Sequence, residues 1–294
     1  MPHHDGFNHE YATVNGLRYH FVREGSGAPL FLVHGWPGFY HEWRLNIEPL
    51  SRRFDLVVPD MRGYAYTDKP DLPPEEGYVD TAFAEDIRAL ADQLAFQRIS
   101  LVSHDFGSAW VQRFARLYPE RVERLVFFQP VYPGIGMRWL EPGRAMEAWY
   151  MMFHQLPWAE DLVGSSHRAT ELYIRHFLTH WSHNKDVWTD EDIDAYTEAF
   201  SQPGALRGGF NCYRAAFRTA GRPPDGDLKV HAPTLVLWAE KDPILPVAWS
   251  DKLGDFFTDL TFRRVPDTGH FVMREQPELV NQSIIDFVGA VAAK

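Results

Sequence analysis

The segment Leu101-Val102-Ser103-His104-Asp105-Phe106-Gly107-Ser108 carries the fold signal of this 294-residue sequence. An apolar run ends here in a short turn that leads into a helix-like sequence, which is the setting of a nucleophile elbow. The turn of an elbow is strained, so it needs small residues two positions before and two positions after the nucleophile. Ser103 and Gly107 stand in this relation to Asp105, whereas a nucleophilic Ser103 would be flanked by Leu101 and Asp105. We therefore predict that Asp105 is the nucleophile.

A carboxylate in this position changes the class of reaction that the sequence predicts. It attacks an electrophilic sp³ carbon and forms an alkyl ester, whereas a serine attacks a carbonyl and forms an acyl ester. The alternative is that Asp105 only caps the N-terminus of the following helix, as aspartate often does. The presence of partner residues at other strand ends decides between these interpretations.

Short apolar runs bounded by turn residues recur on both sides of this segment, as expected of buried parallel strands. They cover residues 30–33, 56–58, 99–102, 125–128, 234–238 and 260–265. Between the second and third runs, five apolar residues fall on one helical stripe, Phe83, Ile87, Leu90, Ala91 and Leu94. Asn15-Gly16 between two apolar segments predicts an antiparallel hairpin before them. The pattern predicts an α/β fold with a mostly parallel, doubly wound sheet.

The alternation of strands and helices stops after Phe128 for roughly ninety residues, which read as helices without a strand-like run. Five of the ten tryptophans lie in this insertion. We expect a core domain formed by residues 1–130 and 226–294 and a helical cap formed by residues 131–225. A last helix is predicted over residues 277–291.

Composition restricts the partners of the protein. With 29 Lys and Arg against 40 Asp and Glu, the formal net charge of −11 repels nucleic acid and anionic membrane surfaces. Cys212 is the single cysteine, so no intrachain disulfide is possible. The sequence shows no signal-peptide pattern and no apolar stretch of about 18 residues. We expect a cytoplasmic protein.

Two candidate partners of Asp105 follow later predicted strands. Lys241-Asp242-Pro243 comes after the run at 234–238, and Thr268-Gly269-His270-Phe271 comes after the run at 260–265. The chain order of nucleophile, acid and histidine is that of the triads of α/β hydrolases. Each residue alone reads as a solvated turn residue, but three at three strand ends in this order favour a triad of Asp105, Asp242 and His270.

His34-Gly35-Trp36-Pro37-Gly38 follows the first long apolar run, where this kind of fold places half of its oxyanion hole. The backbone N–H groups of Trp36 and Phe106 are the expected donors. Pro37 has no N–H and is expected to fix the loop. The alternative is an ordinary Gly-Pro turn.

Taken together, the sequence resembles the epoxide hydrolases of the α/β-hydrolase superfamily. The resemblance rests on four segments spread over nearly the whole chain: His34-Gly35-Trp36-Pro37, Asp60-Met61-Arg62-Gly63-Tyr64, Ser103-His104-Asp105-Phe106-Gly107 and Gly269-His270-Phe271. It implies two hydrogen-bond donors from the cap to the epoxide oxygen, commonly tyrosines, and no cofactor or metal. Tyr150 and Tyr213 stand in matching contexts, with His154 as the reserve for the first donor.

The resemblance also leaves two other functions open. Haloalkane and haloacetate dehalogenases are close relatives, but they usually carry a tryptophan or an arginine after the nucleophile, where this chain has Phe106. Some relatives place the acid just after the strand that ends at Phe128, where this chain has Gln129-Pro130, so Asp242 is the acid expected here. A small-molecule receptor of the same fold is a further alternative, against which the intact triad argues.

Further residues are expected to line the site of a small-molecule epoxide and water: His34, Pro37, His104, His154, Trp181 and Phe271. The spacing of His176, His180 and His183 resembles that of metal ligands, but no acidic or cysteine set accompanies it, so we expect no metal. A homodimer is left open.

Overall fold

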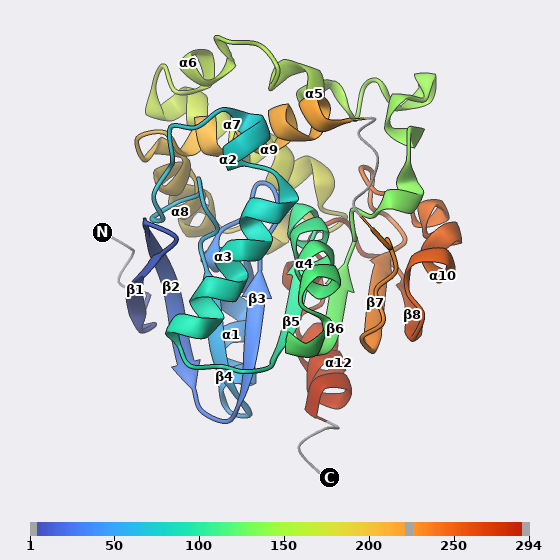
Figure 1. Cartoon of the computed structure of the whole chain (residues 1–294). Helices are drawn as coiled ribbons and strands as arrows, with labels where there is room; N and C mark the ends of the chain where they lie inside the picture. Colours follow the sequence, from blue (N-terminus) through green and yellow to red (C-terminus); the bar gives the residue numbers. More distant parts are fainter. Residues whose placement is uncertain (1–4, 221–225, 290–294) are drawn as a thin grey trace.

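The computed structural model of the chain describes residues 5–220 and 226–289 (Figure 1). Within these residues lies one eight-stranded sheet in the order β1-β2-β4-β3-β5-β6-β7-β8. Its strands are β1 (His9–Val14), β2 (Leu17–Gly25), β3 (Ala28–Val33), β4 (Phe54–Pro59), β5 (Ile99–His104), β6 (Val122–Phe128), β7 (Thr234–Ala239) and β8 (Leu260–Val265). The pairs β1–β2 and β2–β4 are antiparallel and all other neighbours are parallel. The predicted α/β fold and its strands are confirmed.

The predicted hairpin joins β1 and β2. Asn15 and Gly16 both have positive φ values, of 49° and 79°, as a two-residue turn with the twist of the flanking strands requires. The register runs from His9 opposite Val22 to Val14 opposite Leu17.

Strand β5 lies in the middle of the sheet, between β3 and β6. All six of its residues are buried, which explains why it reads as an almost continuous apolar run. The chain passes from β3 to β4 on one side and later to β5 on the other, so the strand order reverses between β3 and β5. Ligands of open α/β sheets bind beside the carboxyl ends of strands at such a reversal.

Helices cover both faces of the sheet, with α3 and α4 on one face and α1 and α12 on the other (Figure 1). The helices are α1 (Arg44–Ser51), α2 (Pro74–Gly77), α3 (Asp80–Gln93), α4 (Phe106–Leu117), α5 (Trp149–Phe153), α6 (Ala159–Val163), α7 (His167–Trp181), α8 (Asp190–Ser201), α9 (Ala205–Thr219), α10 (Leu253–Phe256), α11 (Val272–Glu275) and α12 (Pro277–Gly289). The predicted apolar stripe of α3 is buried except for Leu94, which is partly exposed. In the described part of the chain, no helix has the length and apolar character needed to cross a membrane.

Helices α5 to α9 form a cap over the carboxyl ends of the central strands (Figure 1). Residues 129–220 contain α-helices, short 3₁₀ helices and loops but no strand. The segment at which we expected the insertion to end, residues 221–224, lies outside the described residues. Helix α12 begins at Pro277 as predicted and is described to Gly289.

A buried charge cluster joins the cap to the core. Asp192 on α8 accepts hydrogen bonds from Arg274 (2.6 Å), Arg44 (2.6 Å) and His41 (2.9 Å). Burial alone would raise the pKa of the Asp192 carboxyl, but its hydrogen bonds to His41 and Arg44 and the charge of Arg274 hold that pKa far below its usual range. Because a buried charge without its partners is costly, this cluster keeps α8 in one position on the core.

The contact between α9 and the loop after β4 yields a stability prediction. A Cβ atom added at Gly208 would lie 2.0 Å from the carbonyl oxygen of Gly63, so Gly208→Ala must push α9 away from the core. We expect a destabilisation of about 1–3 kcal/mol, as for other overpacked sites, measured as a lower midpoint of thermal unfolding. Gly254→Ala on α10 is the control, because nothing lies within 4 Å of its added Cβ. An unchanged midpoint for Gly208→Ala would contradict this packing.

Candidate active site

Asp105 sits in a strained turn between β5 and α4. Its backbone angles are φ 49° and ψ −124°, a combination that residues other than glycine rarely adopt. Its carboxylate accepts no N-cap hydrogen bond; apart from the N–H of the adjacent Phe106, its donor comes from the loop after β3, so the alternative of a simple helix cap does not describe it. A Cβ atom at Gly107 would lie 2.5 Å from the carbonyl oxygen of His34, and one at Gly35 would lie 2.5 Å from the Cβ of Asp105. The elbow geometry predicted from small flanking residues is present.

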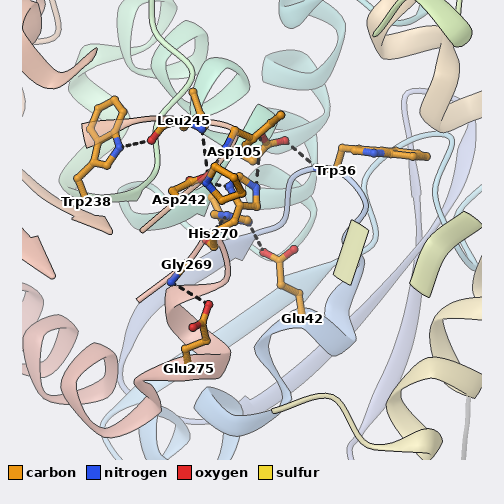
Figure 2. Close-up of polar contacts among 12 residues, drawn as sticks. Trp36, Glu42, Asp105, Trp238, Asp242, Leu245, Gly269, His270 and Glu275 are labelled. Carbon is orange, nitrogen blue, oxygen red and sulfur yellow. Dashed lines mark hydrogen bonds and ion pairs between the residues drawn. The ribbon is translucent and has the colours of Figure 1, made fainter. Parts of the chain in front are cut away.

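The backbone N–H groups expected to form an oxyanion hole point at the Asp105 carboxylate. The Trp36 N–H donates to Oδ1 of Asp105 at 2.9 Å (Figure 2). The Phe106 N–H also donates a hydrogen bond to this carboxylate. The Trp36–Pro37 peptide is cis, and Pro37 is buried. Two donors from two different loops thus converge on one carboxylate.

His270 lies between two carboxylates. Its Nδ1 is 2.8 Å from Oδ2 of Asp242, and its Nε2 is 3.8 Å from Oδ2 of Asp105 (Figure 2). The other oxygen of Asp242 accepts the N–H groups of Ile244 (2.8 Å) and Leu245 (3.0 Å), which fixes the orientation of this carboxylate. Because a carboxylate only accepts, Nδ1 is the nitrogen that donates to Asp242, and Nε2 faces Asp105. A separation of 3.8 Å is too long for a hydrogen bond between them.

Burial and charge act against each other in this pair. Burial raises the pKa of Asp105, and the charges of His270 and His104 and the two N–H donors only partly offset it. Burial lowers the pKa of His270, but the carboxylates of Asp242, Asp105 and Glu42 outweigh burial, so that the pKa lies above 6.5. The pKa values of Asp105 and His270 are therefore each linked to the charge of the other.

The two cap tyrosines meet above Asp105, one from α5 and one from α9. Tyr150 and Tyr213 are buried, and their rings are 5.4 Å apart and nearly perpendicular. Burial raises the pKa of both phenols well above 10, and the negative charge of Asp105 adds to the shift of each. Both phenols therefore keep their protons near the nucleophile.

The ring nitrogens of two residues predicted to line the substrate site, His34 and His104, are bonded to protein groups. His34 bonds the Gly35 carbonyl through Nδ1 (2.9 Å) and the Met61 N–H through Nε2 (3.0 Å). His104 bonds Oε1 of Glu42 through Nδ1 (3.1 Å) and the carbonyl of His270 through Nε2 (3.0 Å). Because protein groups occupy both nitrogens of each ring, these histidines hold loops of the site together and have no polar group left for a substrate.

His154 is placed beside the phenols but is engaged elsewhere. Its ring lies 4.6 Å from that of Tyr213, while Nε2 bonds the Tyr173 hydroxyl at 2.6 Å. Burial and the nearby Arg214 lower the pKa of His154 well below 6.5, so it is a neutral ring in the wall of the cap. This arrangement makes His154 a weaker donor candidate than Tyr150.

The remaining predicted residues surround His270. The rings of Trp181 and Phe271 lie 5.0 and 5.1 Å from the His270 ring, and both are buried. Sequence reasoning missed the partners that orient the site, Glu42 and Glu275, because neither lies in a motif. In the described part of the chain, no group of three or more His, Cys, Asp or Glu side chains could hold a metal ion. His180 instead pairs with Glu147 at 2.8 Å.

Comparisons with known proteins give the family to which the chain belongs. A family model described as alpha/beta hydrolase fold matches residues 28–277. The chain is 31% identical over 295 residues to "Soluble epoxide hydrolase" of Corynebacterium sp. (strain C12), covering 95% of this chain and 96% of that protein. It is 31% identical over 294 residues to "Epoxide hydrolase 4" of Homo sapiens, covering 95% of this chain and 78% of that protein.

A solved structure shows the same architecture over nearly the whole length. The structure named "Epoxide hydrolase CorEH without ligand" superposes with a TM-score of 0.84 at 27% identity, covering 97% of this chain and 99% of that chain. Both the family match and the relatives extend over the core and the cap. The chain therefore belongs to the α/β hydrolase fold family and is a hydrolase of that family.

Proposed function

We propose that this enzyme hydrolyses an epoxide to a vicinal diol through a covalent ester on Asp105. The observation that carries the proposal is the set of groups around the Asp105 carboxylate. They are two backbone N–H donors, Nε2 of His270 at 3.8 Å, and two buried phenols from the cap. A carboxylate nucleophile suits attack on a carbon, and phenols suit the protonation of a departing alkoxide. The names of the relatives support the same reaction. A cytoplasmic location is part of the proposal.

The two oxygens of Asp105 have different tasks in the first step. Oδ1 accepts the Trp36 N–H, which leaves Oδ2 as the oxygen that attacks the less hindered epoxide carbon. As the C–O bond of the epoxide breaks, Tyr150 and Tyr213 donate hydrogen bonds to the oxygen and one of them transfers its proton. The product of this step is a hydroxyalkyl ester of Asp105.

In the second step His270 acts as the general base. Its Nε2 removes a proton from water, and the resulting hydroxide attacks the ester carbonyl while the N–H groups of Trp36 and Phe106 stabilise the oxyanion. Asp242 keeps the protonated nitrogen of His270 directed away from the reaction and stabilises the imidazolium. Collapse of the tetrahedral intermediate expels the diol as an alkoxide, which takes the proton of the new Asp105 carboxyl group. The proton on His270 then returns, directly or through water, to the phenolate left by the first step, so that Asp105, His270 and the tyrosine recover their starting states.

The same nucleophile also suits the dehalogenation of a halogenated alkane, which is the second candidate reaction. The Phe106 ring packs edge-on against Tyr213 at 4.8 Å and offers no N–H to a halide. A panel of epoxides and halogenated alkanes, assayed for diol and for halide, distinguishes the two reactions. Failure to turn over any of them would favour a small-molecule receptor.

The first prediction concerns the covalent intermediate. His270→Gln removes the base for ester hydrolysis but leaves the nucleophile in place, so the ester should accumulate. Intact-mass measurement after mixing with styrene oxide should show one added substrate mass, and digestion should place it on the peptide that contains Asp105. Asp105→Asn is the control and should remain unmodified. A folded His270→Gln variant that is inactive and unmodified would refute covalent catalysis.

The second prediction concerns the two phenols. Tyr150→Phe and Tyr213→Phe should each slow ester formation by about 10- to 100-fold, because the remaining phenol still acts on the same oxygen. The double variant should lose nearly all ester formation. Tyr196→Phe is a matched control, since it removes a buried hydroxyl that has no hydrogen-bond partner within residues 5–220 and 226–289 and lies outside the site. If the double variant forms ester at the rate of the unmodified enzyme, the donors lie elsewhere.

The third prediction concerns the charge coupling between nucleophile and base. The negative charge of Asp105 is among the causes that raise the pKa of His270 in the free enzyme. Asp105→Asn removes this charge, so His270 should lose its proton at a lower pH than in the unmodified enzyme. Titration of the imidazole by NMR measures this shift, and Asp194→Asn on an exposed position is the control. An unchanged or higher midpoint in Asp105→Asn would contradict the coupling.

The pKa of His270 should fall during turnover for the same reason. Ester formation neutralises Asp105, so it lowers the pKa of His270 and favours the neutral base at the moment when water must be activated. The hydrolysis step should therefore retain its rate to a lower pH than the midpoint of His270 in the free enzyme would allow.

A further inference from the structure

The loop that carries His270 is held through its backbone by several other parts of the chain. The His270 N–H donates to the carbonyl of Trp181 (2.8 Å), the last residue of cap helix α7. The His270 carbonyl accepts from Nε2 of His104 at 3.0 Å. One residue earlier, the Gly269 N–H donates to Oε1 of Glu275 at 3.0 Å (Figure 2). The position of the base is thus fixed by hydrogen bonds to the main chain as well as by Asp242.

Glu275 binds the cap with its second oxygen. Its Oε2 accepts the N–H of Asn184 at 2.9 Å, and the His183 N–H also donates to this carboxylate. One carboxylate on α11 therefore connects the loop of the catalytic base to the segment that follows α7. Hydrogen bonds from backbone N–H groups to a charged carboxylate are among the strong ones in proteins.

The backbones of these two segments are in close contact. A Cβ atom at Gly269 would lie 2.4 Å from the His183 nitrogen and 2.5 Å from the Trp181 carbonyl oxygen. Only glycine fits at this position without moving one of the two segments. A displacement of residues 181–184 is therefore expected to move His270 directly.

Neighbouring residues hold the cap to α11 independently of Glu275. Arg274 pairs with Asp192 of α8, and the ring of Phe271 packs edge-on against Trp188 at 5.0 Å. The loss of the Glu275 carboxylate therefore leaves the cap in place. Its effect should be confined to the loop at Gly269 and to the segment after α7.

We propose that Glu275 is a positioning residue for ester hydrolysis: it holds Gly269 against the cap so that Nε2 of His270 faces Asp105. Glu275 does not contact the reacting atoms. Asp105 is held by the N–H groups of Trp36, in the loop after β3, and of Phe106, the first residue of α4, and neither contacts Glu275, so ester formation does not depend on Glu275. This inference rests on the proposed function, since it concerns the second step of that reaction.

The test compares the rates of ester formation and ester hydrolysis in the variant Glu275→Gln with those of the unmodified enzyme. The amide has one acceptor oxygen, and its NH₂ group faces a backbone N–H, so one of the two connections is lost. In rapid-mixing experiments with styrene oxide, the rate constant of ester formation should be unchanged, which also shows that the variant is folded, and the ester should accumulate at least as far as in the unmodified enzyme. Ester hydrolysis should slow by about 10- to 100-fold, as small displacements of catalytic groups do. Glu278→Gln, on an exposed position of α12, is the control.

The pH profile separates positioning from an electrostatic effect. The oxygens of Glu275 bond backbone N–H groups and not the His270 ring, so the midpoint of the hydrolysis profile should be unchanged while its plateau falls. A shifted midpoint with an unchanged plateau would overturn the positioning role. Wild-type hydrolysis rates in Glu275→Gln would do the same.

A measurement without substrate keeps this inference separate from the proposed reaction. Amide hydrogen exchange at Gly269 and Asn184 should be faster in Glu275→Gln than in the unmodified enzyme and in Glu278→Gln. Unchanged exchange would refute the connection whatever the reaction is. Exchange could increase in Glu275→Gln while neither the unmodified enzyme nor His270→Gln forms an ester. That result would refute the proposed reaction but leave the connection made by Glu275 intact.

Discussion

The positive φ of Asp105 is the constraint on which the rest of the site depends. It turns the carboxylate out of the sheet, toward the loop after β3, and it brings the two loops so close that Gly35 and Gly107 have no room for a Cβ atom. The strain is sustained because β5 is buried between parallel neighbours and α4 packs against the sheet. In return, the Trp36 N–H reaches Oδ1 of the nucleophile without any movement of the backbone.

Once the carboxylate is buried, charge balance determines how the other groups behave. Burial works against an ionised Asp105, and the nearby imidazole and N–H groups work in its favour. The charges of Asp242 and Asp105 raise the pKa of His270 against the effect of burial, whereas burial, with the charge of Asp105 added, raises the pKa of both cap phenols and keeps them protonated. In the proposed mechanism, a carboxylate, an imidazole and two phenols with different protonation states therefore coexist within one enclosed site, because each state supports the others.

The site belongs to the core and the cap together. The core supplies the three residues at the carboxyl ends of its strands, and the cap supplies Tyr150 and Tyr213 from two helices. Their relative position depends on contacts far from the chemistry, chiefly the buried cluster around Asp192 and the backbone bonds of Glu275. The cap thus contacts the loop that carries His270 and also covers Asp105.

By itself, the sequence determined the sheet, the hairpin and the candidate triad, because these depend on local patterns: apolar runs, turn residues, small residues beside Asp105 and the order of motifs along the chain. Only the tertiary structure decided which polar side chains are already occupied. Glu42 meets His104 across 62 residues, and Glu275 meets Asn184 across 91. No pattern within one segment encodes such a pairing, since it arises when distant strands and helices pack together. For the same reason His34 and His104 read as substrate contacts in their motifs, while in the folded protein backbone and carboxylate partners occupy both of their ring nitrogens.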